Sequence, residues 1–251
     1  MICLRIISCM ILLYYQPGHC AEIIGGNEVT PHSLPHMALL QDGSGRPVCG
    51  GTLIHPRWVL TAAHCQNIKK VSLGVHSIQN KNKEPWTIRK VKAFPHPCYD
   101  DKEMVNDLML LKLDKAVKET KAVKFLPVLR ELKEPQPGSK CLVAGWGKTT
   151  NLSKKMSDVL MAANVTVVNR VKCNSPEYYN YNPIITHSML CAGPMTKKRE
   201  DACGGDSGGP LQCNGVLVGV TSFGKRCGVM PGVYSFLSER QITWIHKTIK
   251  K

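Results

Sequence analysis

Short apolar runs separated by turn-forming residues are the feature that most restricts how this chain can fold. The runs lie at residues 48–54, 58–63, 108–113, 141–146, 164–168 and 215–223, and Gly, Pro, Asn and Lys cluster between them. Many short runs of this kind are typical of β-strands in a sandwich or a barrel. We therefore predict an all-β fold over most of the chain.

One helix is predicted, at the C-terminal end. Ser238 and Gln241 have the spacing of a capping box, in which each side chain bonds a backbone N–H group at the start of a helix. Three isoleucines then recur at helical spacing: Ile242, Ile245 and Ile249. The polar segment 130–140 contains two prolines and is the predicted linker between two halves of the chain.

Residues 1–20 are predicted to be a secretory signal. Arg5 precedes an apolar stretch at residues 6–15, and the small residues Gly18 and Cys20 suit a cleavage site. The apolar stretch is too short to span a bilayer, which needs about 20 residues, and we identify no transmembrane segment later in the chain. We therefore expect a secreted protein whose cysteines can be oxidised.

The chain contains 12 cysteines, and nine of them follow residue 20. An odd number leaves at least one cysteine without a partner in its own chain. The cysteines of the expected mature chain are Cys49, Cys65, Cys98, Cys141, Cys173, Cys191, Cys203, Cys213 and Cys227.

The formal net charge is +15, from 33 Lys and Arg against 18 Asp and Glu, and it favours polyanionic partners. Five lysines recur every third residue: Lys112, Lys115, Lys118, Lys121 and Lys124. Further basic clusters lie at residues 197–199 and 225–226. We expect binding to sulfated proteoglycan, with simple solubility as the alternative. No recognised nucleic-acid-binding module is present, so specific nucleic-acid binding is not expected.

Three local patterns carry residues that suit acyl transfer. His64 lies in the sequence TAAHC, Asp107 directly precedes an apolar run, and Ser207 lies in the glycine-rich sequence GDSGGP. Taken singly, each has an ordinary explanation as a structural histidine, a turn aspartate or a loop serine. Together they supply a nucleophile, a base that titrates near neutral pH, and an acid that orients the base.

The sequence resembles the chymotrypsin-like serine proteases over essentially the whole chain after residue 22. The resemblance rests on the start IIGG at residue 23, the TAAHC, NDLMLL, GWG and GDSGGP segments, and PGVY at residue 231. It implies two six-stranded antiparallel β-barrels, residues 23–127 and 128–251, with the C-terminal helix in the second segment. The active site is expected in the cleft between the barrels, with His64, Asp107 and Ser207 as the catalytic residues.

The resemblance also implies roles for residues around this site. The backbone N–H groups of Gly205 and Ser207 would bind the oxyanion. Asp201 would form the floor of the substrate pocket and select Arg or Lys before the scissile bond. Three further residues are expected to bind substrate: Ser222, Gly224 and Gly232. The implied disulfides are Cys49–Cys65, Cys141–Cys213, Cys173–Cys191 and Cys203–Cys227, which leave Cys98 over.

Within the family, the sequence resembles the granzyme A and K group, and A more than K. Glu22 rather than a basic residue precedes Ile23, so Ala21-Glu22 is predicted to be an activation dipeptide that a dipeptide-removing peptidase cleaves. The freed Ile23 amine would then pair with Asp206. Granule storage and a homodimer linked through Cys98 are also implied by this resemblance. Gly204 stands where a larger polar residue is more usual, so the contacts beyond the pocket stay open.

The sequence predicts two N-glycosylation sites and no metal site. Asn151 and Asn164 begin N-glycosylation sequons. Neither a metal nor another cofactor is expected, because the segment 74–90 offers only Glu84 as an acidic ligand, and calcium binds 6–8 oxygens.

Two other functions fit parts of the sequence. One is an inactive, cationic heparin-binding protein on a protease scaffold, and the other is a tryptase outside the granzymes. The presence of His64, Asp107 and Ser207 argues against the first, and the Glu22 dipeptide and Cys98 argue against the second.

Overall fold

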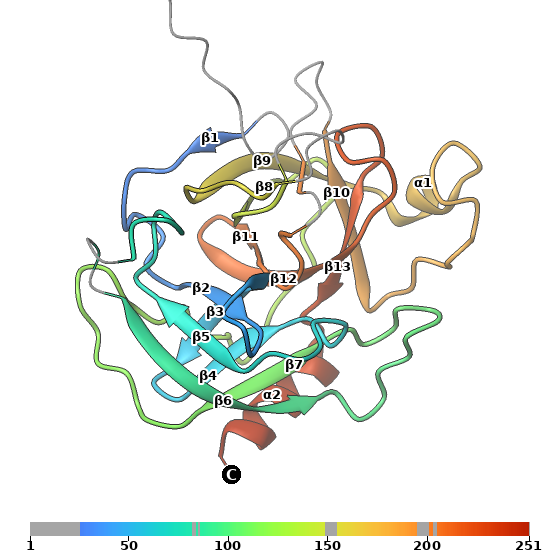
Figure 1. Ribbon diagram of the computed structural model, residues 1–251. Coiled ribbons are helices and arrows are strands. Elements are labelled where there is room, and N and C mark those ends of the chain that lie inside the picture. The colour runs from blue at the N-terminus through green and yellow to red at the C-terminus, as the bar shows by residue number, and fades with distance from the viewer. Residues whose placement is uncertain are drawn as a thin grey trace, which may run out of the picture.

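The computed structural model describes residues 26–250, except residues 82–83, 85, 149–154, 195–200 and 203–204. The described chain forms two closed β-barrels side by side, with a short helix at the C-terminal end (Figure 1). The predicted signal and activation dipeptide lie outside the described residues. No helix in the described part is long and apolar enough to cross a membrane.

The first barrel has the strand order β2-β3-β4-β7-β6-β5, and each pair of neighbouring strands is antiparallel. Its strands are β2 (Met37–Gln41), β3 (Pro47–His55), β4 (Trp58–Thr61), β5 (Lys70–Leu73), β6 (Thr87–Pro95) and β7 (Met109–Leu113). Closure leaves no unpaired strand edge. Leu53, Val59, Leu60 and Leu110 are fully buried in its core.

The second barrel is the ring β9-β10-β13-β12-β11-β8, which closes where β8 pairs with β9. Its strands are β8 (Lys140–Gly145), β9 (Met161–Val168), β10 (Met189–Gly193), β11 (Pro210–Cys213), β12 (Val216–Phe223) and β13 (Gly232–Phe236), and β1 (Asn27–Glu28) pairs with β9. Asn214 and Gly215 form the β11–β12 turn with φ of 52° and 76°, as tight hairpins require. All six predicted apolar runs thus overlap strands.

Contacts between the barrels fix their relative position. Met37 and Leu39 of β2 pack with Ala144 of β8 in one buried cluster. The Trp146 Nε1–H group donates to the carbonyl oxygen of His76 at 3.0 Å. The predicted catalytic residues come from both barrels. The packing at this interface therefore determines whether their side chains can lie close together.

The two helices lie on the outside of the barrels. Helix α1 (Arg170–Asn174) begins after Asn169, whose side chain accepts from two backbone N–H groups. Helix α2 (Glu239–Ile249) buries Ile242 and Ile245 against the core of the first barrel, although it follows the second barrel in sequence. The predicted capping box is wrong in detail: Ser238 is the N-cap residue, but its hydroxyl bonds the Gln241 side chain and not a backbone N–H group.

Candidate active site

His64 and Asp107 meet because the strands that carry them are neighbours. Strands β4 and β7 pair antiparallel, with Thr61 opposite Met109. His64 follows the end of β4 and Asp107 precedes the start of β7, so both leave the barrel at the same end of this strand pair.

Asp107 is fully buried, and hydrogen bonds hold its carboxylate on both oxygens. Oδ1 accepts from the backbone N–H of His64 at 2.9 Å, and Oδ2 accepts from His64 Nδ1 at 2.7 Å. The Ser222 hydroxyl donates to Oδ2 at 2.5 Å, and the Ser235 hydroxyl donates to the carbonyl oxygen of Asp107 at 3.0 Å. An ionised carboxylate only accepts, so Nδ1 carries the proton and Nε2 of a neutral His64 has a free lone pair.

Ser207 lies in the loop before β11, and backbone hydrogen bonds tie this loop to both barrels. Gly50 N–H donates to the Ser207 carbonyl oxygen at 2.8 Å, and Gly208 N–H donates to Thr221 O at 2.8 Å. Gly208 has φ of +79°, and a Cβ there would lie 2.0 Å from Thr61 Oγ1. Only glycine fits this position, which explains one glycine of the GDSGGP sequence.

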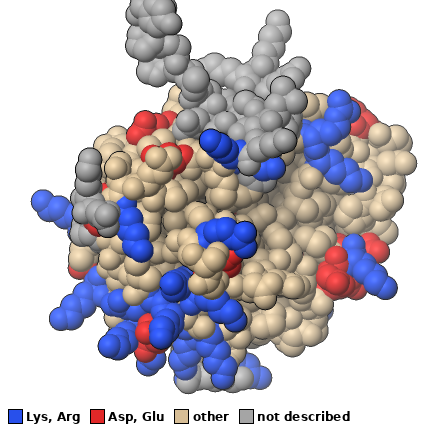
Figure 2. Space-filling view, viewed as in Figure 1, with Lys and Arg blue, Asp and Glu red and all other residues tan. Residues whose placement is uncertain are grey.

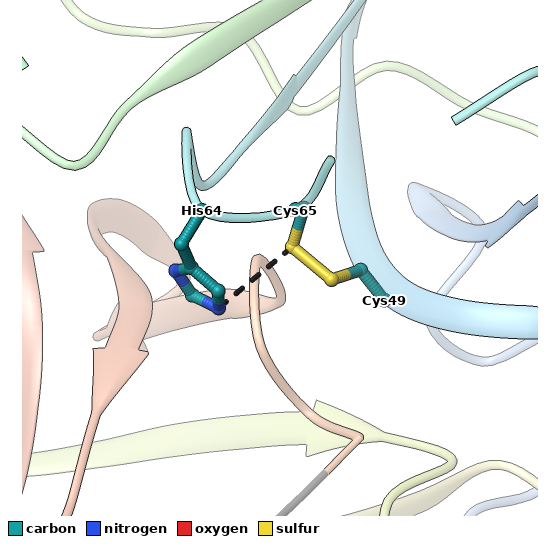
Figure 3. A group of neighbouring side chains, drawn as sticks. All are labelled: Cys49, His64 and Cys65. Carbon is teal, nitrogen blue, oxygen red and sulfur yellow. Dashed lines mark hydrogen bonds between the residues drawn. A yellow bond between two sulfur atoms is a disulfide. The ribbon is translucent and has the colours of Figure 1, made fainter. Parts of the chain in front are cut away.

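The Cys49–Cys65 disulfide lies beside His64 (Figure 3). His64 Nε2 lies 4.0 Å from Cys65 Sγ, and Cys49 directly precedes Gly50, which bonds Ser207. The hydrogen bonds of the described residues do not include one between Ser207 and His64. Ser207 and His64 are therefore connected through Gly50 and the Cys49–Cys65 disulfide, and not by a direct hydrogen bond among the described residues.

The same three side chains, Cys49, His64 and Cys65, lie close enough together to suggest a metal centre (Figure 3). Their sulfur atoms are bonded to each other in the disulfide. A disulfide offers no thiolate ligand, so this group does not fit a metal ion.

A cavity of about 240 Å³ opens next to Ser207. Its lining residues are Ala202, Ser207, Thr221, Ser222, Phe223, Gly224, Cys227, Gly232 and Tyr234. A Cβ on Gly224 would lie 3.8 Å from Gly232 Cα, so these two glycines face each other across the cavity. Three of the four residues that the resemblance assigns to substrate binding line it: Ser222, Gly224 and Gly232.

Asp201 is buried beside this cavity with 1% of its surface exposed. Oδ2 accepts from Gly228 N–H at 2.9 Å, whereas Oδ1 is buried without a hydrogen-bond partner among the described residues. A Cβ on Gly232 would lie 3.4 Å from Oδ1, which places that oxygen against the cavity wall. Burial raises the pKa of Asp201 to about 7, against the opposing effect of N–H bonds from Gly228 and Ala202.

Asp206 lies between the two residues expected to bind the oxyanion, and its side chain is buried. Gly147 N–H donates to Asp206 Oδ1 at 2.8 Å, and a Cβ on Gly145 would lie 2.2 Å from the same oxygen. The carboxylate is thus packed over two glycines of the second barrel. Gly205 has φ of +104°. Ile23, the predicted partner of Asp206, lies outside the described residues.

The disulfides brace the same region. Three join pairs of described cysteines, with the pairing that the resemblance implies: Cys49–Cys65, Cys141–Cys213 and Cys173–Cys191. Cys227 is also disulfide-bonded, and Cys203 lies outside the described residues. Cys98 is exposed and free. Asn164 is exposed on β9, while Asn151 and Gly204 are not described.

Comparison with known proteins identifies the family. Residues 23–245 match the sequence profile of the trypsin family. The chain belongs to the trypsin family of serine proteases. It is 46% identical to granzyme A from Bos taurus over 237 residues, which cover 93% of this chain and 90% of the relative.

Solved structures agree with this assignment. Neuropsin, a serine protease expressed in the limbic system of mouse brain, is 39% identical with a TM-score of 0.79, over 89% of this chain and 98% of that chain. Human heparin-binding protein is 30% identical with a TM-score of 0.79, over 91% of this chain and 97% of that chain. The protease is a trypsin-like serine endopeptidase.

Several contacts of the site were not predicted from the sequence. Ser222 was assigned to substrate binding alone, yet its hydroxyl bonds Asp107, as described above. The bonds from Ser235 and Gly228 were also missed. They join residues that are 128 and 27 positions apart, and no local pattern signals such contacts.

Proposed function

We propose that this protease cleaves proteins after Arg or Lys, as a granule-stored immune effector similar to granzyme A. The observation that carries the specificity is the Asp201 carboxylate, which is buried beside the cavity with one oxygen unpartnered. A buried carboxylate oxygen without a hydrogen bond lowers the stability of the folded protein. A guanidinium or ammonium group in the cavity would supply the missing bond and the opposite charge. Gly224 and Gly232 leave room for the long side chain that carries this group.

The reaction follows from the arrangement around His64. His64 Nε2 takes the proton of Ser207 Oγ while this oxygen bonds to the scissile carbonyl carbon, and the carbonyl π electrons move onto its oxygen. The backbone N–H groups of Gly205 and Ser207 stabilise that oxyanion. When the C–N bond breaks, His64 returns the proton to the leaving amine, and an acyl-enzyme remains. Asp107 stabilises the imidazolium formed in this step.

Water completes the cycle with the same groups. His64 takes a proton from water as the water oxygen attacks the acyl carbon, and the Ser207 Oγ–carbon bond then breaks with return of the proton to Oγ. Both steps require Ser207 Oγ to reach Nε2. Removal of Ala21-Glu22 would free the Ile23 amine to pair with Asp206, directly before Ser207, and we infer that this pairing brings the loop into its reactive conformation.

Substrate profiling of the mature protein tests this function. Chains that start at Ile23 are incubated with a peptide library, and cleavage is expected after Arg and Lys. Ser207→Ala should abolish turnover, and Asp201→Ser should remove the preference for basic residues. Cleavage after Arg that is undiminished in Asp201→Ser would overturn the specificity, and turnover by Ser207→Ala would overturn the mechanism.

A basic groove on the first barrel supports sulfated proteoglycan as a storage partner. Lys and Arg side chains gather over the part of the surface where the first barrel lies (Figure 2). Arg57, Lys90, Lys92 and Lys112 line a cavity of about 300 Å³, in which Asp114 is the one carboxylate among the described lining residues. Lys92 and Lys112 face each other on paired strands β6 and β7. Like charges in this position repel, and bound sulfate groups would relieve the repulsion.

Heparin affinity chromatography distinguishes binding at this groove from a general effect of the positive charge of the protein. The groove variant changes Lys90, Lys92 and Lys112 to Ser, and we expect it to elute at distinctly lower salt than the wild type. The control variant lowers the charge equally at three exposed second-barrel lysines: Lys140, Lys148 and Lys172. Equal elution of the two variants would refute the groove as the binding site. Tighter binding to RNA than to heparin would identify a different class of partner.

A further inference from the structure

Helix α2 contacts both ends of the segment that leads to the catalytic aspartate. Gln241 is buried with 3% of its surface exposed, and its Nε2–H group donates to Asn106 Oδ1 at 2.8 Å. Asn106 directly precedes Asp107. One turn later, the Trp244 ring lies 4.7 Å from the His96 ring, between centroids. The segment 96–106 is therefore attached to α2 at its first and last residues.

Asn106 depends on side-chain bonds for its conformation. Its φ is +55°, in the left-handed region, which Asn adopts more readily than most residues with a side chain and which its side-chain bonds help to hold. Oδ1 accepts from Gln241, and Nδ2 donates to the Cys98 carbonyl oxygen at 2.8 Å. The Asn106 carbonyl oxygen accepts from Leu108 N–H at 2.7 Å, which turns the chain at Asp107. The backbone of Asn106 therefore sets the direction in which the Asp107 side chain leaves.

The orientation of the Gln241 amide is itself determined. The Ser238 hydroxyl donates to Gln241 Oε1, so the Nε2 end of the amide faces Asn106. With both ends bonded and the side chain buried, this amide has little freedom to turn. The helix thus presents a fixed donor to the residue before Asp107.

We propose that Gln241 is a positioning residue for catalysis: by holding Asn106 in its left-handed conformation, it sets the Asp107 carboxylate at bonding distance from His64. This inference rests on the proposed roles of Asp107 and His64. The competing interpretation is that Gln241 merely anchors α2 to the first barrel. The two differ in what a substitution does to turnover in a protein that stays folded.

Gln241→Met tests the proposal, because Met has a similar length and no N–H donor. With an Arg peptide substrate, we expect kcat to fall about 10-fold to 100-fold, as small misplacements of catalytic groups do, with KM little changed. The affinity for benzamidine, an amidinium cation, should also be unchanged, because the cavity beside Asp201 contains no residue of α2 or of segment 96–106. The acid limb of the pH profile of kcat should move to lower pH, because a displaced Asp107 stabilises the His64 imidazolium less.

A matched control and a second variant keep the test decisive. Ile245→Val removes buried volume from the same helix and keeps the Gln241 and Trp244 side chains that contact the segment, so it should lower Tm while kcat stays within twofold. Asn106→Ala removes the bonds of Asn106 to both Gln241 and Cys98 and should lower kcat at least as much. The double variant of Gln241 and Asn106 should then be no worse than Asn106→Ala, because that variant has already lost the contact with Gln241.

Each outcome has a defined meaning. Unchanged kcat in Gln241→Met, with a loss of Tm like that of Ile245→Val, would show that Gln241 is only an anchor and would overturn the proposal. Additive losses in the double variant would do the same. If Gln241→Met does not fold, unchanged kcat and pH profile in Asn106→Ala overturn the proposal. A wild type that cleaves no Arg peptide, whatever its helix contacts, would instead overturn the proposed function and this inference with it.

Discussion

Binding of a small amidinium cation such as benzamidine is expected to weaken steeply as the pH falls, because Asp201 must be ionised to bind it. Burial raises the pKa of this carboxyl from its ordinary value of 3.8 to about 7. A protonated Asp201 offers no charge to the cation, so the apparent Kd grows by the factor 1 + 10^(pKa − pH). With a pKa of about 7, the Kd should be about 90-fold larger at pH 5 than at pH 8.

The raised pKa of Asp201 also makes the stability of the ligand-free protein depend on pH. The folded protein holds the Asp201 proton up to about pH 7, whereas the unfolded chain releases it near pH 3.8. The ligand-free protein therefore loses stability through this group as the pH rises from about 4 to about 7. A bound cation favours the ionised form, so the increase in Tm that benzamidine produces should grow over the same pH range.

The assay is equilibrium binding of benzamidine by calorimetry from pH 5 to pH 8, which does not depend on turnover. Near-UV circular dichroism at each pH shows that the protein stays folded. Asp201→Asn is the control, and its weak binding should not vary with pH. A constant Kd in the wild type over this range would refute the reasoning that burial of Asp201 raises its pKa.

Three further predictions concern activation, assembly and packing. Protein verified by mass spectrometry to retain Ala21-Glu22 should be inactive on Arg peptides, and activity equal to that of chains starting at Ile23 would contradict the activation step. Cys98 is exposed and free within the described chain, so a non-reducing gel should show a dimer that Cys98→Ser converts to active monomers, and a wild-type band near monomer mass would rule out the covalent dimer. Gly208→Ala should lower the free energy of unfolding by about 1–3 kcal/mol more than Gly215→Ala, because both have positive φ but only Gly208 has a neighbour within 4 Å of the added Cβ. Equal losses in chemical denaturation would show that the contact with Thr61 is unimportant.

The sequence alone was sufficient for the fold class and for the three residues proposed to be catalytic. Apolar runs of five to nine residues between turn residues predict strands, and all six overlap strands of the two barrels. His64, Asp107 and Ser207 lie in local motifs whose residue types suit acyl transfer, and such motifs are contained within a few consecutive positions. The C-terminal helix was also predictable, since its isoleucines repeat at helical spacing.

The details of the site depended on contacts between distant parts of the chain. Ser222 bonds Asp107 across 115 positions, and Gln241 bonds Asn106 across 135. The predicted capping box at Ser238 is wrong in detail for the same reason, because the Gln241 amide bonds the Ser238 hydroxyl and the distant Asn106 side chain and not a backbone N–H group. Local pattern records which residues are neighbours in sequence. The partners of Asp107 come together only when the two barrels pack, and the unpartnered oxygen of Asp201 arises only when the second barrel folds around it and removes it from water.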